Sequence, residues 1–310
     1  MLIATLVPLL IGVGLAVATR PLAARQRPAG AARILLFGMG ASAATMLASL
    51  GLLAWFAVAA VPTVADIGRW RGGDVVSQGD IPLPVALLAA AALVGIAVRL
   101  VLAARGHLAD LREVLTLERR VPSWRRPARL VMVDDAAPIA HAVTPLPGCG
   151  GHIVVSRGLH AELSSEELRR AVLEHERAHL RHRHGILLGL GALTVVVNPL
   201  LTPSLDALRF QLERWADDDA AERTSPATVA EAVATVALAA RHSRRALAFD
   251  GAATATAARI NALLVDTRCR RSSVPAALIV GLTAAAVVAT AVACHHTELL
   301  FEGLRSLRTR

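Results

Sequence analysis

The chain has 310 residues, and 55% of them are hydrophobic, which excludes an ordinary soluble globular protein and indicates a protein embedded in a membrane. Its formal net charge is +9, but the arginines cluster beside apolar runs and aromatic residues make up only 3% of the chain. Positively charged flanks of membrane spans account for this charge, and no nucleic-acid partner is expected.

The N-terminal run Leu2–Ala18 is uncharged and about long enough to cross a bilayer when its flanks reach the interface. A cleaved signal peptide is the rival interpretation, because Ala16-Val17-Ala18 resembles a cleavage site. However, the residues before the run carry no charged side chain, and four arginines follow it. We therefore expect an anchor that stays in the protein.

Two further spans are predicted, at Ile34–Val61 and Ile81–Ala104. Small residues of the second span permit close packing of helices, and these are Gly38, Gly40, Ala41 and Ser42. The positive-inside rule places the basic segment Thr19–Arg33 in the cytoplasm. The N-terminus and the short polar loop Pro62–Asp80 then face outward, and the chain after the third span begins in the cytosol.

A small α+β part is expected after these spans. Residues His107–Arg120 are predicted to form an amphipathic helix that continues from the membrane. Two β-branched runs, Arg129–Asp134 and Gly151–Ser156, are predicted strands because Gly, Pro and Asp bound them. The segment between them, Pro138–Gly151, contains three Pro and three Gly and is predicted as a structured loop.

The sequence Leu173–Gly185, LEHERAHLRHRHG, contains a match to H-E-x-x-H formed by His175, Glu176 and His179. On a helix, residues four apart lie one turn above each other, so the two imidazoles can converge on one tetrahedral metal ion. Glu176 lies about 100° further round the helix and can meet the open position of the metal. In a zinc peptidase that position holds a water molecule, and the glutamate takes its proton as it attacks a peptide carbonyl.

The motif is predicted to lie in the middle of a helix. Ser164 and Glu167 are typical of a capping box, with Leu163 and Leu168 as its hydrophobic staple. The helix is expected to end at a break at Gly185. Basic and histidine side chains near this end are interpreted as solvated, and these are Arg177, Arg181, His182, Arg183 and His184.

A third ligand is expected from a second helix, Leu205–Glu222. Glu213 and Asp217 lie four apart on one face of it. Glu213 is the predicted ligand, and Asp217 is predicted to accept the free N–H of a ligand imidazole, which fixes the tautomer and angle of that ring. Asp218 and Asp219 point elsewhere and are interpreted as solvated. Three other histidines lack ligand spacing and are interpreted as structural or surface residues, namely His141, His152 and His160.

The run Ile186–Val197 is apolar, yet we predict that it does not cross the bilayer. His175 and His179 precede it and Glu213 follows it, and the ligands of one ion must lie on one membrane face. The run is also only twelve residues long before the break at Asn198-Pro199, against roughly 20 residues for a span. A buried core helix or a re-entrant segment fits better.

Beyond the second helix, Ser225-Pro226 is an N-cap and N1 pair that opens an Ala-rich helix to about Arg241. A further short helix is expected at Arg259–Leu264, and the last clean span at Val274–Cys294. The arginines before this span are expected to stay cytoplasmic, so the span exits outward and a short tail follows.

These motifs carry a resemblance to a known family. AVLEHERAHLRHRHG, followed by LERWADDDA and preceded by GGHIVVSRGLHAELSSEEL, resembles the BlaR/MecR group of integral-membrane gluzincin peptidases and, more distantly, the HtpX group. The resemblance covers roughly Arg129–Leu264. It implies zinc as the metal, with the ligands, base and supporting carboxylate at His175, His179, Glu213, Glu176 and Asp217.

The resemblance also implies how a substrate is held. In related gluzincins an edge strand lies beside the active helix and pairs with an extended substrate. Ile153, Val154 and Val155 are the candidates for that strand here. Such a mode recognises the backbone more than the side chains.

The sequence therefore predicts a predominantly α membrane protein with about four transmembrane helices and a small α+β gluzincin-type zinc-peptidase domain. Residues 1–104 are expected to hold three spans. Residues 105–272 are expected to form the cytosol-facing peptidase domain, with a membrane-associated segment near 186–201. Residues 273–310 are expected to form the fourth span and the tail.

The expected function is that of a membrane-embedded zinc-dependent endopeptidase with one Zn²⁺ per chain, which cleaves a cytosolic or membrane-proximal protein such as a repressor. The alternatives are an HtpX-like quality-control protease and a non-catalytic metal-binding sensor or scaffold. Retention of Glu176 argues against the last, because a pure binding site needs no base. The expected partners are a protein or peptide substrate and the lipid bilayer.

The expected location is the bacterial inner membrane, with the active site facing the cytoplasm. All 33 basic residues are Arg, Tyr is absent and Ala is abundant, which is typical of a GC-rich bacterial genome.

Overall fold

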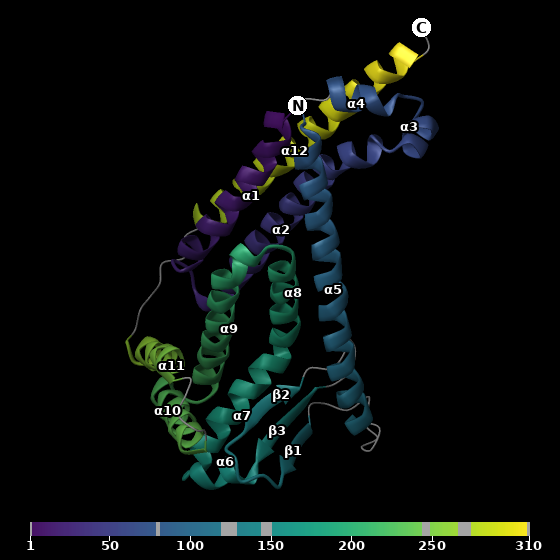
Figure 1. Cartoon of the computed structure of the whole chain (residues 1–310). Coiled ribbons are helices and arrows are strands. Elements are labelled where there is room, and N and C mark those ends of the chain that lie inside the picture. The colour runs from purple at the N-terminus through teal and green to yellow at the C-terminus, as the bar shows by residue number, and fades with distance from the viewer. Residues whose placement is uncertain are drawn as a thin grey trace.

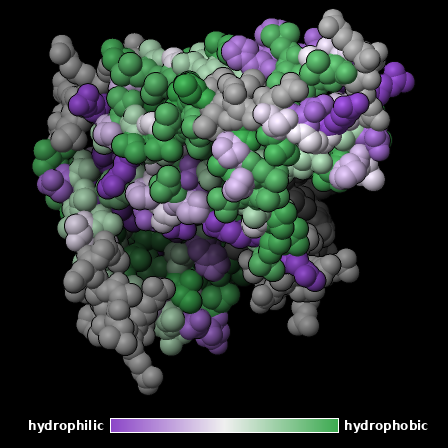
Figure 2. Space-filling view, turned by 45° about the horizontal axis from the view of Figure 1, so that its top comes forward, coloured by the Kyte–Doolittle hydropathy of each residue, from purple (hydrophilic) through white to green (hydrophobic). Residues whose placement is uncertain are grey.

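Four long helices dominate the computed structural model, which describes residues 2–78, 81–118, 129–143, 151–243, 249–265 and 274–308 (Figure 1). They are α1 (Leu2–Ala23), α2 (Pro28–Ala59), α5 (Leu83–Glu118) and α12 (Val274–Arg308). Each contains a stretch long and apolar enough to cross a membrane, which confirms the expected number. Large apolar side chains such as Leu88 and Val287 stay exposed on these helices, and Figure 2 shows hydrophobic residues, in green, over much of one face of the molecule. Such a surface suits contact with lipid.

Small residues bring α1 and α2 close together. A Cβ added at Gly38 would lie 2.3 Å from Thr19 Oγ1, and the Ser42 hydroxyl donates a 2.7 Å hydrogen bond to the carbonyl oxygen of Gly12. A Cβ added at Gly40, by contrast, would meet nothing within 4 Å. The expectation of close packing is therefore confirmed for Gly38 and Ser42 and wrong for Gly40.

The segment predicted as an outer polar loop folds into two short helices, α3 (Pro62–Gly68) and α4 (Gly72–Gln78). Proline opens α3 at its first turn, where its missing N–H costs nothing, and Arg69 ends the helix in the left-handed region with φ 62°. Trp70 is buried between the two helices, and its Nε1 donates a 2.9 Å hydrogen bond to the carbonyl oxygen of Ala59. The prolines thus start structure here, and the loop prediction is wrong.

The residues after Cys294, expected as a tail, continue α12 and pack on α3 and α4. The ring of Phe301 lies 4.8 Å from that of Trp70, and Arg305 Nε donates a 3.0 Å hydrogen bond to the carbonyl oxygen of Gly68. This assembly lies at the end of the molecule opposite the sheet (Figure 1).

The described residues contain one three-stranded sheet, with strands β1 (Arg129–Val133), β2 (Ala140–Val143) and β3 (His152–Ser156) in the order β1-β3-β2. β1 runs parallel to β3, and β2 runs antiparallel to it. Both predicted strands are present, but β2 lies in the segment predicted as a loop, so that prediction is wrong for residues 140–143. Ser156 fixes this short strand, because its Oγ accepts from Ile139 N–H at 2.9 Å and donates to Ala137 O at 2.6 Å.

The sheet order contradicts the expectation that Ile153, Val154 and Val155 form an edge. β3 is paired on both sides, so its backbone groups are already used. Ile153 and Val155 are also buried, at 2% and 6% exposure. The two edge strands of the described sheet are β1 and β2, and β2 is the one that packs on α7.

The helices after the sheet are α6 (Arg157–Glu162), α7 (Glu166–Arg181), α8 (His184–Val197), the 3₁₀ helix η1 (Pro199–Leu201), α9 (Thr202–Arg223), α10 (Pro226–Ser243) and α11 (Phe249–Leu264). Ser165, not Ser164, caps α7, since its Oγ accepts from Leu168 N–H at 3.2 Å. The predicted capping box is therefore wrong by one residue. Leu163 and Leu168 nevertheless pack in one core cluster. Ser225 caps α10 as predicted, accepting from Thr228 N–H at 3.1 Å.

α8, η1 and α9 form a hairpin whose tip lies among the membrane-length helices (Figure 1). α8 packs against α2 and α5, and α9 packs against α2. At the tip, the buried Asn198 donates through Nδ2 to Ser42 Oγ at 3.2 Å. Both arms return to the end that holds the sheet, and α8 is too short to count among the membrane-length helices. The hairpin therefore enters between the membrane-length helices and leaves at the same end of the molecule.

Gly191 determines how closely α8 and α9 approach. A Cβ there would lie 2.7 Å from Leu208 Cδ2, whereas a Cβ at Gly189 of the same helix would meet nothing within 4 Å. We expect Gly191→Val to force the hairpin apart and destabilise the fold by about 1–3 kcal/mol, with Gly189→Val close to wild type. Thermal unfolding of the purified variants measures this. Equal melting temperatures for the two variants would contradict the packing described.

Candidate metal centre

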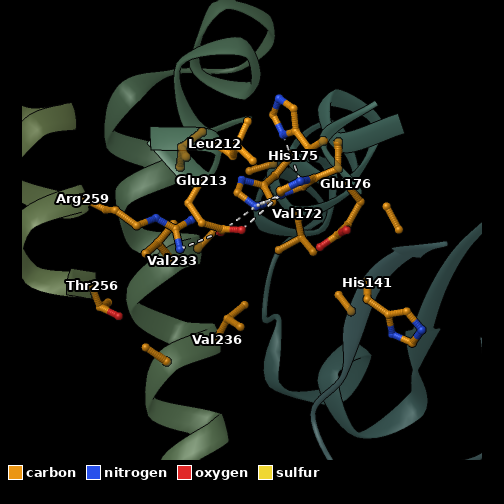
Figure 3. A pocket seen from close by; sticks show the side chains of 18 of the residues that line it. His141, Val172, His175, Glu176, Leu212, Glu213, Val233, Val236, Thr256 and Arg259 are labelled. Atoms are coloured by element: carbon orange, nitrogen blue, oxygen red, sulfur yellow. Dashed lines mark hydrogen bonds and ion pairs between the residues drawn. The ribbon is translucent and has the colours of Figure 1, made fainter. Parts of the chain in front are cut away.

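His175, Glu176 and His179 of α7 all line one cavity, and Figure 3 labels the first two of them. The Nε2 atoms of the two histidines lie 3.1 Å apart, as one helical turn allows. α7 is held in place by its buried face, which includes Leu168 and Val172 and packs with β3. The spacing read from the sequence thus places both imidazoles at one point.

α9 brings Glu213 to the same point. Its Oε2 lies 3.5 Å from His175 Nε2, and its Oε1 lies 3.5 Å from His179 Nε2. Tetrahedral zinc with bonds of about 2.0 Å separates its ligand atoms by about 3.3 Å. The distances of 3.1 to 3.5 Å match that value, so these three side chains fit a tetrahedral metal ion.

Asp217 follows Glu213 by one turn and lies behind His175. It is 1% exposed, and its Oδ1 is 2.9 Å from His175 Nδ1. Because Nδ1 faces this carboxylate, Nε2 is the nitrogen that His175 turns toward Glu213. The structure therefore brings Asp217 to the position predicted for it.

Arg259 of α11 pairs with two carboxylates of α9, those of Glu213 and Asp217, and Figure 3 shows it beside Glu213. Its Nε and Nη2 each donate a 2.7 Å hydrogen bond to Asp217, and its Nη1 lies 3.0 Å from Glu213 Oε2. The sequence predicted a helix here without a role for this residue. A lone arginine in the apolar run AARINALL is the signal that could have found it. The cation of Arg259 offsets part of the negative charge of these two carboxylates.

The ionisation of these groups shows what charge the site favours. Burial lowers the pKa of His175, but the contacts with Asp217 and Glu213 raise it overall to about 10. Burial raises the pKa of Glu213, but His175 and Arg259 lower it overall to about 2. The carboxylates thus favour positive charge at the point where the imidazoles meet, and a divalent metal supplies such charge.

Glu176 is buried, at 8% exposure, and lies beside β2. Burial raises its pKa, and a hydrogen bond from the backbone of Ala142 only partly opposes this. A carboxylate with a raised pKa is suited to receive a proton near neutral pH. The same hydrogen bond ties this residue to the edge strand.

The chain reverses after α7 earlier than predicted. The break is at Arg183, which has a left-handed φ of 54°, rather than at Gly185, and α8 begins at His184. This reversal carries His184 back against His179, with the two Nδ1 atoms 3.0 Å apart. His184 is 2% exposed, and burial with the neighbouring histidines lowers its pKa to about 3. The interpretation of His184 as solvated is therefore wrong.

His182 and Asp219 are also less solvated than expected. The ring of His182 stacks on Trp215 with centroids 4.4 Å apart, and its Nε2 lies 3.3 Å from Asp219 Oδ2. Arg181 pairs with Asp219 too. The remaining side chains of this group are exposed as predicted, namely Arg177, Arg181, Arg183 and Asp218.

The cavity over the site has a volume of about 480 Å³. β2 lines one side through residues 140–142, and α10 lines another with valines that include Val233 and Val236. Figure 3 shows these valines across from His141, whose side chain is exposed. His141 is thus a surface residue as predicted, yet it faces the cavity. His160 is exposed, and His152 is partly buried in β3.

A comparison with protein families matches residues 115–246 to the model of Peptidase family M48. The matched part contains α7 and α9, and therefore His175, Glu176, His179, Glu213 and Asp217, but not Arg259. No curated protein and no solved structure matches the chain. The match supports a metallopeptidase of the M48 type in this part of the chain, and zinc is the metal typical of such enzymes.

Proposed function

We propose that the chain is a membrane-embedded zinc-dependent endopeptidase. The observation that carries this proposal is the meeting of His175, His179 and Glu213 at tetrahedral distances, with the buried Glu176 beside them. A cavity of about 480 Å³ lies over them.

The division of labour among the side chains follows from their positions. His175, His179 and Glu213 would hold zinc, which when bound polarises the peptide carbonyl and lowers the pKa of water. Glu176 takes the proton of the attacking water on its carboxylate and passes it to the leaving amine. Asp217 holds the tautomer of His175, so that its Nε2 stays unprotonated and would be free to bind the metal.

β2 is the strand suited to hold an extended substrate, in place of Ile153–Val155. Ser156 N–H donates to Ile139 O, so residue 139 forms a bonded pair with β3. In an antiparallel ladder the bonded pairs alternate, so the backbone groups of Ala140 and Ala142 face away from β3. The hydrogen bond from the Ala142 backbone to Glu176 agrees with this register. The groups of Ala140 and the carbonyl of Ala142 are therefore placed to pair with a substrate.

We propose that the protease has a regulatory role. Its proposed substrate is a cytosolic or membrane-proximal protein such as a repressor. Quality control of the HtpX kind is the second candidate. The buried Glu176 with its raised pKa favours an enzyme over a metal-binding sensor or scaffold, because binding alone requires no such group.

The site is proposed to face the cytoplasm of a bacterial inner membrane. Arginines cluster around the α1–α2 turn, and one of them, Arg33 near the start of α2, lies over the ring of Trp215 on α9, 5.3 Å from its centroid. The metal centre thus lies at the arginine-rich end of the membrane helices, which the positive-inside rule assigns to the cytoplasm.

The proposed domains are residues 1–104, 105–272 and 273–310. α5 runs without a break from Leu83 to Glu118, so the first boundary falls within one helix. The second boundary lies outside the described residues. The segment near 186–201 belongs to the hairpin that packs on α2, which supports its proposed association with the membrane.

The hairpin topology gives a testable expectation. Single cysteines replacing Arg183 and Glu222, in a background without the three native cysteines, should both react with an impermeant thiol reagent only from the cytoplasmic side. The physical reason is that the ligands before and after α8 must share one ion. Labelling of the two positions from opposite sides would exclude Glu213 as a ligand.

Asp217→Ala tests the supporting carboxylate. We expect zinc affinity to fall by roughly 10–100-fold without being lost, the usual scale for a partner of a ligand histidine. Competition with a chelator measures it. Complete loss of metal would make Asp217 a ligand, and unchanged affinity would remove it from the site.

The proposed activity is tested with protein reconstituted in liposomes and an unfolded protein as substrate. Cleavage should stop when a chelator removes the metal and return with Zn²⁺. Cells with wild-type protein or Glu176→Gln can then be compared for proteins that only the wild type cleaves. One or two cleaved regulators would favour the repressor class, and many misfolded membrane proteins would favour quality control.

A further inference from the structure

His184 has no role in the proposed activity, yet it is the most buried histidine near the site. Its 2% exposure results from the reversal at Arg183, which turns the first residue of α8 back toward α7. Among the described residues, its ring makes one hydrogen bond, between its Nδ1 and the Nδ1 of His179 at 3.0 Å. A buried imidazole with a single partner points to a task at that partner.

We propose that His184 is a positioning residue for His179, an inference that rests on the proposed zinc site. A neutral imidazole has one donor and one acceptor nitrogen. His179 must leave Nε2 unprotonated to bind a metal, so its proton is on Nδ1. That N–H then donates to Nδ1 of His184, whose own proton is on Nε2. His184 thereby does for His179 what Asp217 does for His175.

The two positioning residues differ in charge, since Asp217 is an anion and His184 is neutral. The charge balance of the site explains this difference. Glu176, Glu213 and Asp217 carry three negative charges when ionised, and Arg259 with a divalent metal carries three positive charges. A carboxylate in place of His184 would leave a fourth negative charge in a buried site. A neutral acceptor orients His179 without that charge.

Aromatic packing fixes the plane of His184. Its ring lies 5.0 Å from that of Trp215 and 5.7 Å from that of His182, and His182 itself stacks on Trp215. Arg33 of α2 lies over the ring of Trp215, with its Cζ atom 5.3 Å from the ring centroid. His184, which contacts His179, is thus connected to the membrane helix α2 through Trp215 and Arg33. Asp217, which contacts His175, is connected to α11 through Arg259.

The test measures metal binding in a Glu176→Gln background, so that no readout depends on catalysis. His184→Leu removes the acceptor, and His184→Asn restores one, because its amide oxygen can occupy the position of Nδ1. His182→Leu is the matched control, since it removes a ring of the same stack that does not contact a metal ligand. Zn²⁺ affinity is measured by chelator competition, and the visible spectrum of bound Co²⁺ reports ligand geometry.

We expect His184→Leu to weaken Zn²⁺ binding by roughly 10–100-fold and to alter the Co²⁺ spectrum. His184→Asn should recover most of the affinity, and His182→Leu should bind like the parent. The proposal is overturned if His184→Leu binds Zn²⁺ as tightly as the parent. It is also overturned if His184→Leu and His184→Asn lose the same amount of Zn²⁺ affinity. Equal losses for His182→Leu and His184→Leu would reduce the role to packing and also overturn it. If the Glu176→Gln parent itself binds no zinc, the proposed function fails instead.

Discussion

Replacing Glu176 with Gln is expected to lower the rate of peptide hydrolysis by at least roughly 10²–10⁴-fold while leaving the metal content unchanged. The side chain lines the cavity beside His175, His179 and Glu213, but it is not one of the three groups that meet there. Gln keeps the size of the side chain and removes its ability to accept a proton. The measurement is hydrolysis by reconstituted protein, with bound zinc determined on the same samples.

Glu167→Gln is the matched control, since it makes the same change at an exposed position of the same helix. It should retain wild-type activity. Normal activity in Glu176→Gln would show that the proposed hydrolytic mechanism is wrong, and loss of zinc in that variant would make Glu176 a ligand.

Arg259→Met is expected to destabilise the protein more than Gly191→Val or a substitution of any one of the proposed metal ligands. Asp217, 1% exposed, would lose two hydrogen bonds of 2.7 Å, and Glu213 would lose its nearby cation. Removing one partner of a buried ion pair typically costs about 3–5 kcal/mol. We therefore expect a lower melting temperature and weaker zinc binding, both measured on purified protein. Added zinc should recover part of the stability, because the metal replaces some of the missing positive charge.

Arg209→Met is the control for this change. Arg209 lines the same cavity, but it is exposed and pairs with Asp206 at the surface, where such pairs contribute little. Arg259→Lys should have a melting temperature and a zinc affinity between those of the wild type and Arg259→Met. It keeps the positive charge but loses the bidentate contact with Asp217. If Arg259→Met and Arg209→Met have equal stability and equal zinc affinity, the role given to Arg259 is contradicted.

The metal-centre residues that the sequence predicted are those whose geometry is local. His175 and His179 meet because four residues make one helical turn, and Asp217 lies behind Glu213 for the same reason. That α7 and α9 would face each other was inferred from the chemistry of a missing ligand and from the resemblance. The four apolar runs were recognisable because a membrane span requires a minimum length.

The features that the sequence missed depend on contacts between distant parts of the chain. The order of the strands decides which one is an edge, and nothing in the run Ile153–Val155 states that both of its sides are paired. β2 is four residues long and lies among prolines and glycines, so its pattern was typical of a loop. His184 looked solvated because the reversal depends on a left-handed Arg183, a conformation that favours Gly and is uncommon for Arg.

The central claim is that one zinc ion is held by His175, His179 and Glu213, and the most direct test is the metal content of the purified protein. We expect about one zinc per chain in the wild type and in Glu176→Gln, and a loss of that zinc in His175→Ala and in Glu213→Ala. Stoichiometric zinc in either alanine variant, or its absence from a folded wild type, would contradict the claim.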